Sequence, residues 1–570
     1  MNPLSTHRAR RLARPHFLAL AAALAAVLAL PATVGAQATN NWRCAGGGWN
    51  GDPVCWSLGT PNSTQNVVIP AGPAGSDLML LTAIGNTVSM RQLTVGDART
   101  EPSTSATAYL YASGSTINVN GSLSGSGNVN VGNADNANAQ LTLTNNSTLN
   151  LGQGGGFSRG GVYVGKSFGN AFSNVQLGIG SLAVQGNSRI NGNVFVNNGR
   201  LDVSGSSDPG YVAISGEVIL GNNPTLGAAS NIAGSVTDLR VSSARANIGV
   251  TSANLAAPSF NSIVATASGV ADFVGRSLVN NLQARSGGMV NINRGASVEA
   301  ANPAIFADGK LTVQSGGSLS TTMLYNNQGG SIDLSGGTIN HRGIDNAGTV
   351  SGTGIIDSVL ETQTFKQQAT GHVQASGGDL ILYGRFDGSA GGSIGTQNGR
   401  LFFYSDALFK GGQVITRSGT DGLIAFGSKV EIGNATQRGS LGAMVADIAL
   451  QNTSNLFLDF GGVTDHDYLS TGGGLLVESG KLTLSTAGSF QAGLGSFFSI
   501  LRATSGITGT FSSIDTTAFA LAPGARLDMS NLYTTGTLAV VAVPEPATWL
   551  SLGAGLLLIG ARARRWRQEA

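Results

Sequence analysis

The densest group of residues that could do chemistry in this sequence is Asp465, His466 and Asp467. Two carboxylates beside an imidazole can bind a metal ion or move a proton. We interpret Asp467 as a turn residue rather than as part of such a site. The other two histidines of the body, His341 and His372, stand apart from any such group. We therefore assign no catalytic residue, no metal site and no cofactor.

The composition indicates what kind of scaffold carries these residues. Glycine accounts for 84 of 570 residues, whereas charged residues make up only 11% and aromatic residues 6%. This profile suits neither a helical protein nor a charged disordered tail, and it favours short strands joined by small polar turns. Eight of the 32 basic residues are arginines at the two ends, whereas nearly all of the 30 acidic residues lie in the body between them. The body therefore carries more acidic than basic residues and is mildly acidic. Nucleic acid is therefore not an expected partner.

The N-terminal segment, 1–38, has the pattern of an export leader. Arginines precede an apolar run, Phe17–Leu30, and a small-residue site follows at Ala36 and Ala38. These three parts in this order are typical of a secretory signal peptide, which we expect to be cut after Ala38. The alternative is an N-terminal anchor that is never cleaved. Cleavage implies that the Sec translocon exports the body.

Two cysteines, Cys44 and Cys55, follow this site closely. Disulfides form in exported compartments, and a metal site would need more ligands than two thiols supply. We expect Cys44 and Cys55 to form a disulfide. The same segment carries Trp42, Trp49 and Trp56 at intervals of seven residues. These rings are either a sugar-binding platform or a plug over the first coil, and we favour the plug.

A strand pattern recurs between residues 110 and 485. A turn containing glycine is followed by a strand core with apolar residues at alternate positions, which buries one face of the strand and leaves the other in water. The cores include Ile117–Val119, Val129–Val131, Leu141–Leu143, Leu149–Leu151, Val162–Val164, Leu182–Val184, Val194–Val196 and Leu201–Val203. A fuller form, glycine, a polar residue and then leucine, starts at Gly199, Gly309, Gly378, Gly399 and Gly480.

The spacing of these strands predicts a solenoid. Gly378 and Gly399 are one repeat apart, and short strands in coils of roughly twenty residues favour a parallel β-helix. We expect an all-β chain whose body is a right-handed parallel β-helix with an N-terminal cap. The stretch from about 235 to 285 is the least regular.

The C-terminal segment combines three features in order. The first is a Pro-Glu-Pro triplet, Pro544 to Pro546, which follows Val543. The second is an apolar run over 547–561, and the third is a group of four arginines, Arg562, Arg564, Arg565 and Arg567. An apolar run of this length is a marginal transmembrane segment, because about twenty residues are needed to span a bilayer. The arginines would hold that end in the cytoplasm. We expect a transmembrane helix at 547–561 that ends in a cytoplasmic basic stop and serves as a sorting signal.

Two parts of the sequence resemble known families. The cap segment and the stretch from about 460 to 543, with "DYLSTGGGLLVESGKLTLS" and "SFFSILRATSGITGTFSSI", resemble the β-helical passengers of autotransporters. The segment "VPEPATWLSLGAGLLLIGARARRWRQ" resembles the PEP-CTERM sorting domain. That resemblance implies recognition by an exosortase, a membrane transpeptidase, with cleavage at or near Pro-Glu-Pro. It also implies a Gram-negative bacterium that makes exopolysaccharide, and delivery to the cell surface or extracellular matrix.

These features give five predicted parts: the signal peptide (1–38), cap and first coils (39–110), β-helix repeats (111–460), autotransporter-like terminal coils (461–543) and sorting signal (543–568). The expected protein is non-catalytic, and structural or adhesive. It would be tethered transiently in the inner membrane and would then organise exopolysaccharide, biofilm or floc. One alternative is a β-helix polysaccharide lyase or hydrolase, because many such enzymes use this fold. Another is a self-assembling, S-layer-like protein.

Overall fold

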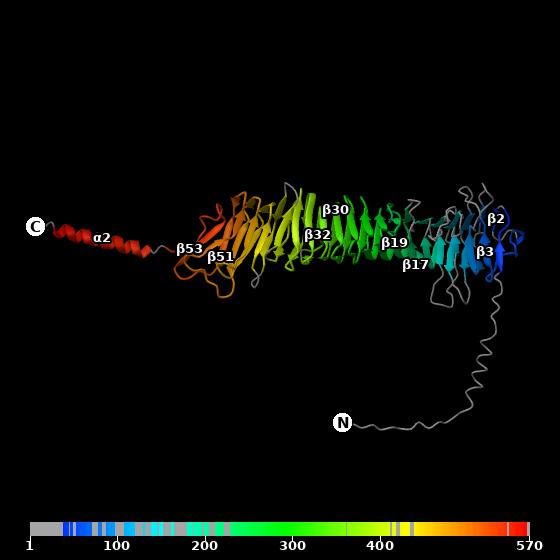
Figure 1. Ribbon diagram of the computed structural model, residues 1–570, viewed down its shortest axis with the longest axis horizontal. Coiled ribbons are helices and arrows are strands. Elements are labelled where there is room, and N and C mark those ends of the chain that lie inside the picture. Colours follow the sequence, from blue (N-terminus) through cyan, green and yellow to red (C-terminus); the bar gives the residue numbers. More distant parts are fainter. Residues whose placement is uncertain are drawn as a thin grey trace, which may run out of the picture.

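The computed structural model shows a long rod of short strands with one helix at its C-terminal end (Figure 1). The structure describes residues 38–566 except 45, 49–52, 71–77, 82–86, 97–107, 114, 120–128, 132–137, 145–146, 152–160, 165–178, 186, 197–198, 205–210, 222–228, 361, 411–412, 418–421, 434–437 and 544–545. The described strands run from β1 (Thr39–Asn41) to β53 (Thr537–Ala542), and the C-terminal helix is α2 (Pro546–Trp566).

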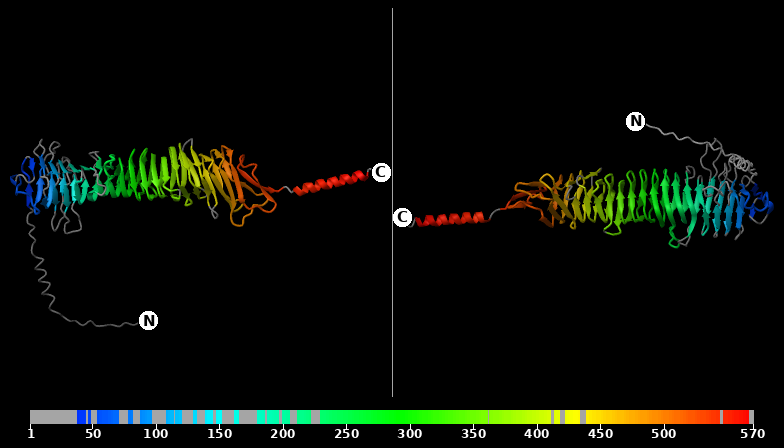
Figure 2. Two further views of the ribbon diagram at one scale, coloured as in Figure 1. Left: turned by 180° about the vertical axis from the view of Figure 1, so that it is seen from behind. Right: turned by 90° about the horizontal axis from the view of Figure 1, so that it is seen from below.

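The rod is built from coils that stack along its length (Figures 1 and 2). In one coil, β24 (Met289–Ile292), β25 (Ser297–Ala300) and β26 (Ala304–Ile305) follow one another around the rod. Each pairs in parallel with its counterpart in the next coil: β27 (Lys310–Gln314), β28 (Ser318–Thr321) and β29 (Leu324–Asn326). Because each strand pairs with strands of the coils before and after it, the body is a parallel β-helix, and the predicted fold class is confirmed.

The predicted strand cores lie in strands. Their apolar residues recur at alternate positions because one face of each strand is buried and the other faces water. In β8 (Thr116–Val119), β9 (Val129–Val131) and β11 (Thr148–Leu151), the apolar residues are buried and the residues between them are partly exposed. The spacing of Gly378 and Gly399 also appears in the register. Leu380 of β34 (His372–Leu382) pairs with Leu401 of β37 (Arg400–Phe403), so the two leucines hold equivalent places in successive coils.

The core is a set of columns that run along the rod. Leu380, Leu401, Ile424, Ile448 and Leu475 follow one another in register, and each is at most 1% exposed. Burying such a side chain stabilises the fold by about 1.5–3 kcal/mol relative to leaving it in water. The column continues across β40 (Leu423–Phe426), β43 (Asp447–Leu450) and β46 (Leu475–Glu478).

One interior column is polar. Asn326 donates to the side-chain oxygen of Asn346 at 2.7 Å, and Asn346 donates to that of Gln367 at 2.8 Å. These residues lie in β29, β31 (Ile344–Asn346) and β33 (Thr364–Gln367), and all three are at most 1% exposed. A buried amide is costly unless it is hydrogen-bonded, and the coil-to-coil repeat supplies acceptors for the amide groups of Asn326 and Asn346.

Residues 235–285, where the sequence pattern is least regular, nevertheless form coils with parallel pairing. This region holds three long strands, β19 (Ser235–Ser242), β21 (Ser259–Thr266) and β23 (Ser277–Ala284). Each pairs in parallel with the next. The strands between them are β20 (Arg245–Ile248) and β22 (Val270–Phe273).

The two ends of the rod are built differently. At the N-terminal end, β1 pairs in parallel with β3 (Asn66–Ile69), and a disulfide-closed segment lies beside it. At the C-terminal end, the last coil strand, β51 (Ser513–Ala518), pairs with β47 (Lys481–Thr486). A small antiparallel sheet then follows, in which β53 pairs with both β48 (Phe497–Ser499) and β52 (Ala525–Asp528). Antiparallel pairing stops the stacking of further parallel coils.

Candidate functional site

The side chains of the run Asp465 to Asp467 do not converge on one point. Asp465 accepts a hydrogen bond from Arg438 at 2.7 Å on the surface. His466 instead stacks on Phe460, with ring centroids 5.6 Å apart, and burial lowers its pKa. The three neighbouring side chains therefore have separate environments, and no cluster of three metal-ligating residues occurs among the described residues.

Asp467 bonds to the backbone of other segments rather than within a local turn. Its carboxylate oxygens accept the backbone N–H groups of Gly439 at 2.8 Å and Asp459 at 2.9 Å, so it ties two neighbouring segments together. It is 1% exposed, and burial raises its pKa to about 7 despite these two hydrogen bonds.

The N-terminal segment is held in the fold by the predicted disulfide. Cys44 and Cys55 are bonded, with Cα atoms 5.2 Å apart. Beside them, Trp42 and Trp56 pack edge to face, with ring centroids 4.9 Å apart, and are 2% and 3% exposed. Buried rings cannot offer a stacking surface to a sugar, so these two tryptophans form a plug. Trp49 lies outside the described residues.

The predicted signal cleavage site lies where the fold begins. Ala36 is outside the described residues, and Ala38 is the first residue of the described chain. The carbonyl of Ala38 accepts the N–H of Asn66 at 3.0 Å, and Thr39 begins β1. A cut after Ala38, which remains a prediction, would therefore leave the first strand intact.

The tail begins where the last strand of the body ends. The N–H of Val543 donates to the carbonyl of Gly524 at 2.9 Å. Pro544 and Glu545 lie outside the described residues, and Pro546 is the first residue of α2. Proline suits a helix start, because its missing N–H has no partner there in any helix.

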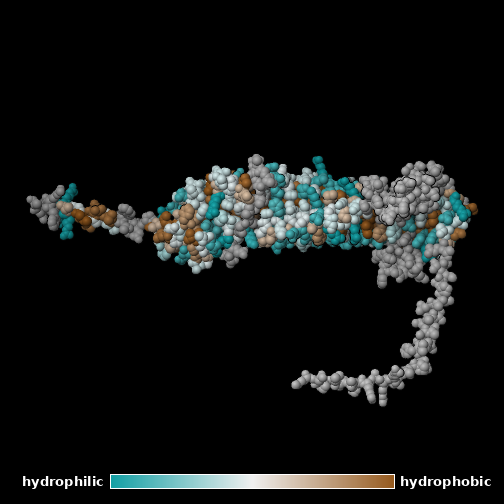
Figure 3. All heavy atoms as spheres, in the orientation of Figure 1, coloured by the Kyte–Doolittle hydropathy of each residue, from teal (hydrophilic) through white to brown (hydrophobic). Residues whose placement is uncertain are grey.

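Helix α2 extends away from the rod (Figures 1 and 2). Its aliphatic side chains are exposed, for example Leu557 at 77% and Ile559 at 69%. Figure 3 shows hydrophobic surface along this helix and a hydrophilic stretch near its outer end. Arg562, Arg564 and Arg565 lie in its last turns, whereas Arg567 lies outside the described residues.

The predicted membrane crossing at 547–561 is not supported. A helix forms there, as expected, but among the described residues no helix has both the length and the apolar character needed to cross a membrane. The physical reason is length: the apolar run ends at Ala561, where the arginines begin, and it is shorter than the roughly twenty residues that a crossing needs.

Comparison with known families identifies this tail. Residues 542–565 match the model of the PEP-CTERM protein-sorting motif. The chain carries a PEP-CTERM tail. The matched range begins at the last residue of β53 and includes all of α2 except its last residue. A PEP-CTERM tail implies an exported protein that an exosortase processes.

The comparisons say less about the body than about the PEP-CTERM tail. The chain is similar to the crystal structure of the Haemophilus influenzae Hap adhesin, with 12% identity and a TM-score of 0.25. The match covers 84% of this chain and 63% of the adhesin chain, so this chain spans less than two thirds of that protein. No curated protein matches this chain.

Sequence reasoning found the PEP-CTERM tail but missed a cleft on the side of the rod. This cleft has a volume of about 480 Å³ and lies across β23, β25, β28 and β30 (Ser331–His341). Glu299, Asn340 and Arg342 are among the residues that line it. Glu299 lies in a different coil from Asn340 and Arg342, and no local motif marks them.

Proposed function

We propose that this chain is an exported, non-catalytic structural or adhesive rod. An exosortase sorts it through its PEP-CTERM tail to the cell surface or the extracellular matrix. There it organises exopolysaccharide, in biofilm or floc, around a Gram-negative cell.

The observation that carries this proposal is the position of the tail. The matched motif coincides with a helix whose apolar side chains are exposed and which extends away from the rod (Figure 1). Exposed apolar surface of this kind marks a site of interaction with another molecule. The body ends at β53, so a cut near Pro544 would separate the helix from a body that keeps all of its strands.

The long body supports a mechanical or adhesive role. Its coils satisfy one another's backbone hydrogen bonds, and its outward positions are mostly polar, as Figure 3 shows for one face. Many small polar contacts repeated along a rod add up to avidity for a repetitive partner. A repetitive partner of this kind is a polysaccharide.

The test is mass spectrometry of the mature protein from its native host. We expect a C-terminal peptide that ends between Val543 and Ala547, with any added mass reporting what the rod is attached to. A mature peptide that extends through Arg567 would contradict sorting by cleavage. The matched variant replaces both Pro544 and Pro546 with alanine and should accumulate uncut.

The non-catalytic part of the proposal has its own measurement. Purified protein should release no new reducing ends or unsaturated sugars from polysaccharides that it binds. Turnover that is lost on changing Asp465 or Asp467 to asparagine would favour the lyase or hydrolase instead.

A further inference from the structure

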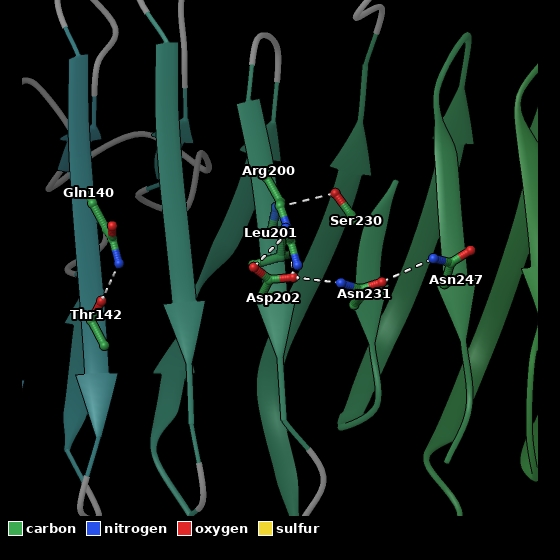
Figure 4. Close-up of polar contacts among 8 residues, drawn as sticks. All are labelled: Gln140, Thr142, Arg200, Leu201, Asp202, Ser230, Asn231 and Asn247. Atoms are coloured by element: carbon green, nitrogen blue, oxygen red, sulfur yellow. Dashed lines mark hydrogen bonds and ion pairs between the residues drawn. The ribbon is translucent and has the colours of Figure 1, made fainter. Parts of the chain in front are cut away.

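Polar side chains on the outer faces of the rod are often paired between coils. Figure 4 shows one such network, in which Asn231 donates to Asp202 at 3.0 Å and Asn247 donates to Asn231 at 3.0 Å. Arg200 of the same coil as Asp202 donates to that carboxylate at 2.8 Å. Each of these groups already uses part of its hydrogen-bonding capacity on a neighbouring side chain.

The side of the rod near residue 340 is different. Glu299, Asn340 and Arg342 line the cleft of about 480 Å³, and none of the three side chains has a hydrogen bond or an ion pair with any residue that the structure describes. Glu299 and Arg342 are exposed. The cleft therefore brings together a cation, an anion and an amide that do not bond to neighbouring side chains in the described part of the chain. In this it differs from the network of Figure 4, whose side chains bond to one another.

The register arranges these groups along the axis. Leu278, Glu299, Ser320 and Asn340 pair in turn across four successive strands. Successive strands lie about 4.8 Å apart, so the column is about 14 Å long. Arg342 lies two residues beyond Asn340, where the chain turns the corner towards β31. The floor of the cleft is the neighbouring buried column, Val279, Ala300 and Thr321.

The backbone around the cleft is already bonded. β25 and β28 each have a parallel partner on both sides, and at the corner the N–H of Arg342 donates to the carbonyl of Thr321 at 3.1 Å. A peptide could not add here as a further strand, because that mode requires a free sheet edge. The ligand must be recognised by side chains alone.

We propose that this cleft binds a linear glycan that lies along the rod. The proposal deepens the adhesive role above and rests on it for its biological meaning. Sugar hydroxyls both donate and accept, so they can bond to the amide of Asn340, the carboxylate of Glu299 and the guanidinium of Arg342. Leu278, 43% exposed, and Val359, 56% exposed, offer apolar contact to the C–H faces of the sugar rings at the two ends of the cleft. The length of the column suits a short segment of an extended chain.

The experiment is calorimetric titration of the purified full chain with three linear hexasaccharides: cellohexaose, chitohexaose and an oligoguluronate. We expect at least one of them to bind weakly, because none of the described residues that line the cleft is aromatic. Changing Asn340 and Arg342 together to alanine should lower that affinity at least tenfold. Both side chains reach the surface, so the fold should be kept, which circular dichroism checks.

The matched control is Arg285→Ala. Arg285 is also an exposed arginine on the rod, but it lies outside the cleft, so its variant should bind as the unchanged chain does. Glu299→Gln should keep part of the affinity, because the amide still bonds to hydroxyls. If none of the three hexasaccharides binds, or if the double variant and the control bind equally, the glycan cleft is refuted.

Failure of the glycan cleft can be distinguished from failure of sorting through the tail. The Asn340 and Arg342 variant should be cut at its tail as the unchanged chain is. Conversely, the variant with alanine at Pro544 and Pro546 should bind the hexasaccharide normally after purification.

Discussion

The N–H of Val543 donates to the carbonyl of Gly524 at 2.9 Å, one residue before Pro544. This bond follows the last ladder pair of the body, Ala525 with Ala542. The boundary between the folded rod and the tail therefore falls at the start of the Pro-Glu-Pro triplet.

A chain that ends at Val543 should be as stable as the full chain. Helix α2 has exposed aliphatic side chains and extends away from the rod, so its removal uncovers no core. Thermal unfolding followed by circular dichroism should give the same midpoint for both chains, allowing for the lost helical signal.

The control for this truncation is a chain that ends at Gly536. It lacks β53 and with it the buried Leu538 and Val540, each of which contributes about 1.5–3 kcal/mol. Its C-terminal end should unfold at a lower temperature. An equal loss in both truncated chains would show that α2 packs on the rod.

The disulfide between Cys44 and Cys55 should stabilise only the N-terminal end. The two cysteines are separated by 11 in the sequence, and closing so small a loop contributes about 3 kcal/mol in the chain-entropy model. Changing both cysteines to alanine should speed hydrogen exchange in β1 and β3. Coils contact only their neighbours, so exchange in β37 should not change. Faster exchange along the whole rod would contradict this local effect.

His341 should make the rod less stable in mild acid. It is fully buried, neither ring nitrogen has a hydrogen-bond partner among the described residues, and burial lowers its pKa to about 4. Between pH 6.5 and 4 the unfolded chain takes up a proton that the folded chain refuses. The free energy of unfolding should therefore fall by about 3 kcal/mol across this range, at about 1.36 kcal/mol per pKa unit. Denaturant titrations at several pH values measure it, and His341→Leu should remove this part of the slope.

Asp467 should have the opposite effect over part of the same range. Burial raises its pKa to about 7, so the folded chain holds a proton that the unfolded chain releases above its ordinary value of 3.8. Stability should therefore rise as the pH falls from about 7 towards about 4. Asp467→Asn should remove that rise, and it should also lower stability because one of the two oxygens that accept backbone N–H groups becomes an NH2 group. An unchanged pH slope in this variant would show that Asp467 is ionised in the fold.

The sequence predicted most where coil length and turn chemistry repeat. Leu380 and Leu401 were placed one coil apart because the glycine before each marks the same corner. The sequence pattern is least regular from 235 to 285 for two physical reasons. The first is that its coils differ in length: the step from Leu239 to its partner Ile263 is longer than the step from Ile263 to Leu282, so no fixed period is visible.

The second reason is that several turn positions with a positive φ angle, which glycine usually occupies, hold other residues in this region. Ser243, Ala267, Ser268 and Ser286 adopt positive φ angles between 48° and 62°, which the sequence pattern assigns to glycine. The cleft was missed for a related reason. Glu299 and Asn340 come together only through the register of three strands, and neither residue is unusual in its own segment.

The coil-by-coil construction makes this protein a spacer of adjustable length. Each coil adds about 4.8 Å and contacts only the coils on either side, so gain or loss of a whole coil would shift the tail relative to the cap without altering either. A duplication of 290–310, for example, would repeat one coil whose register partners, Val290 and Leu311, are already equivalent. The distance over which such a rod can reach from a cell is therefore open to change in small, regular steps.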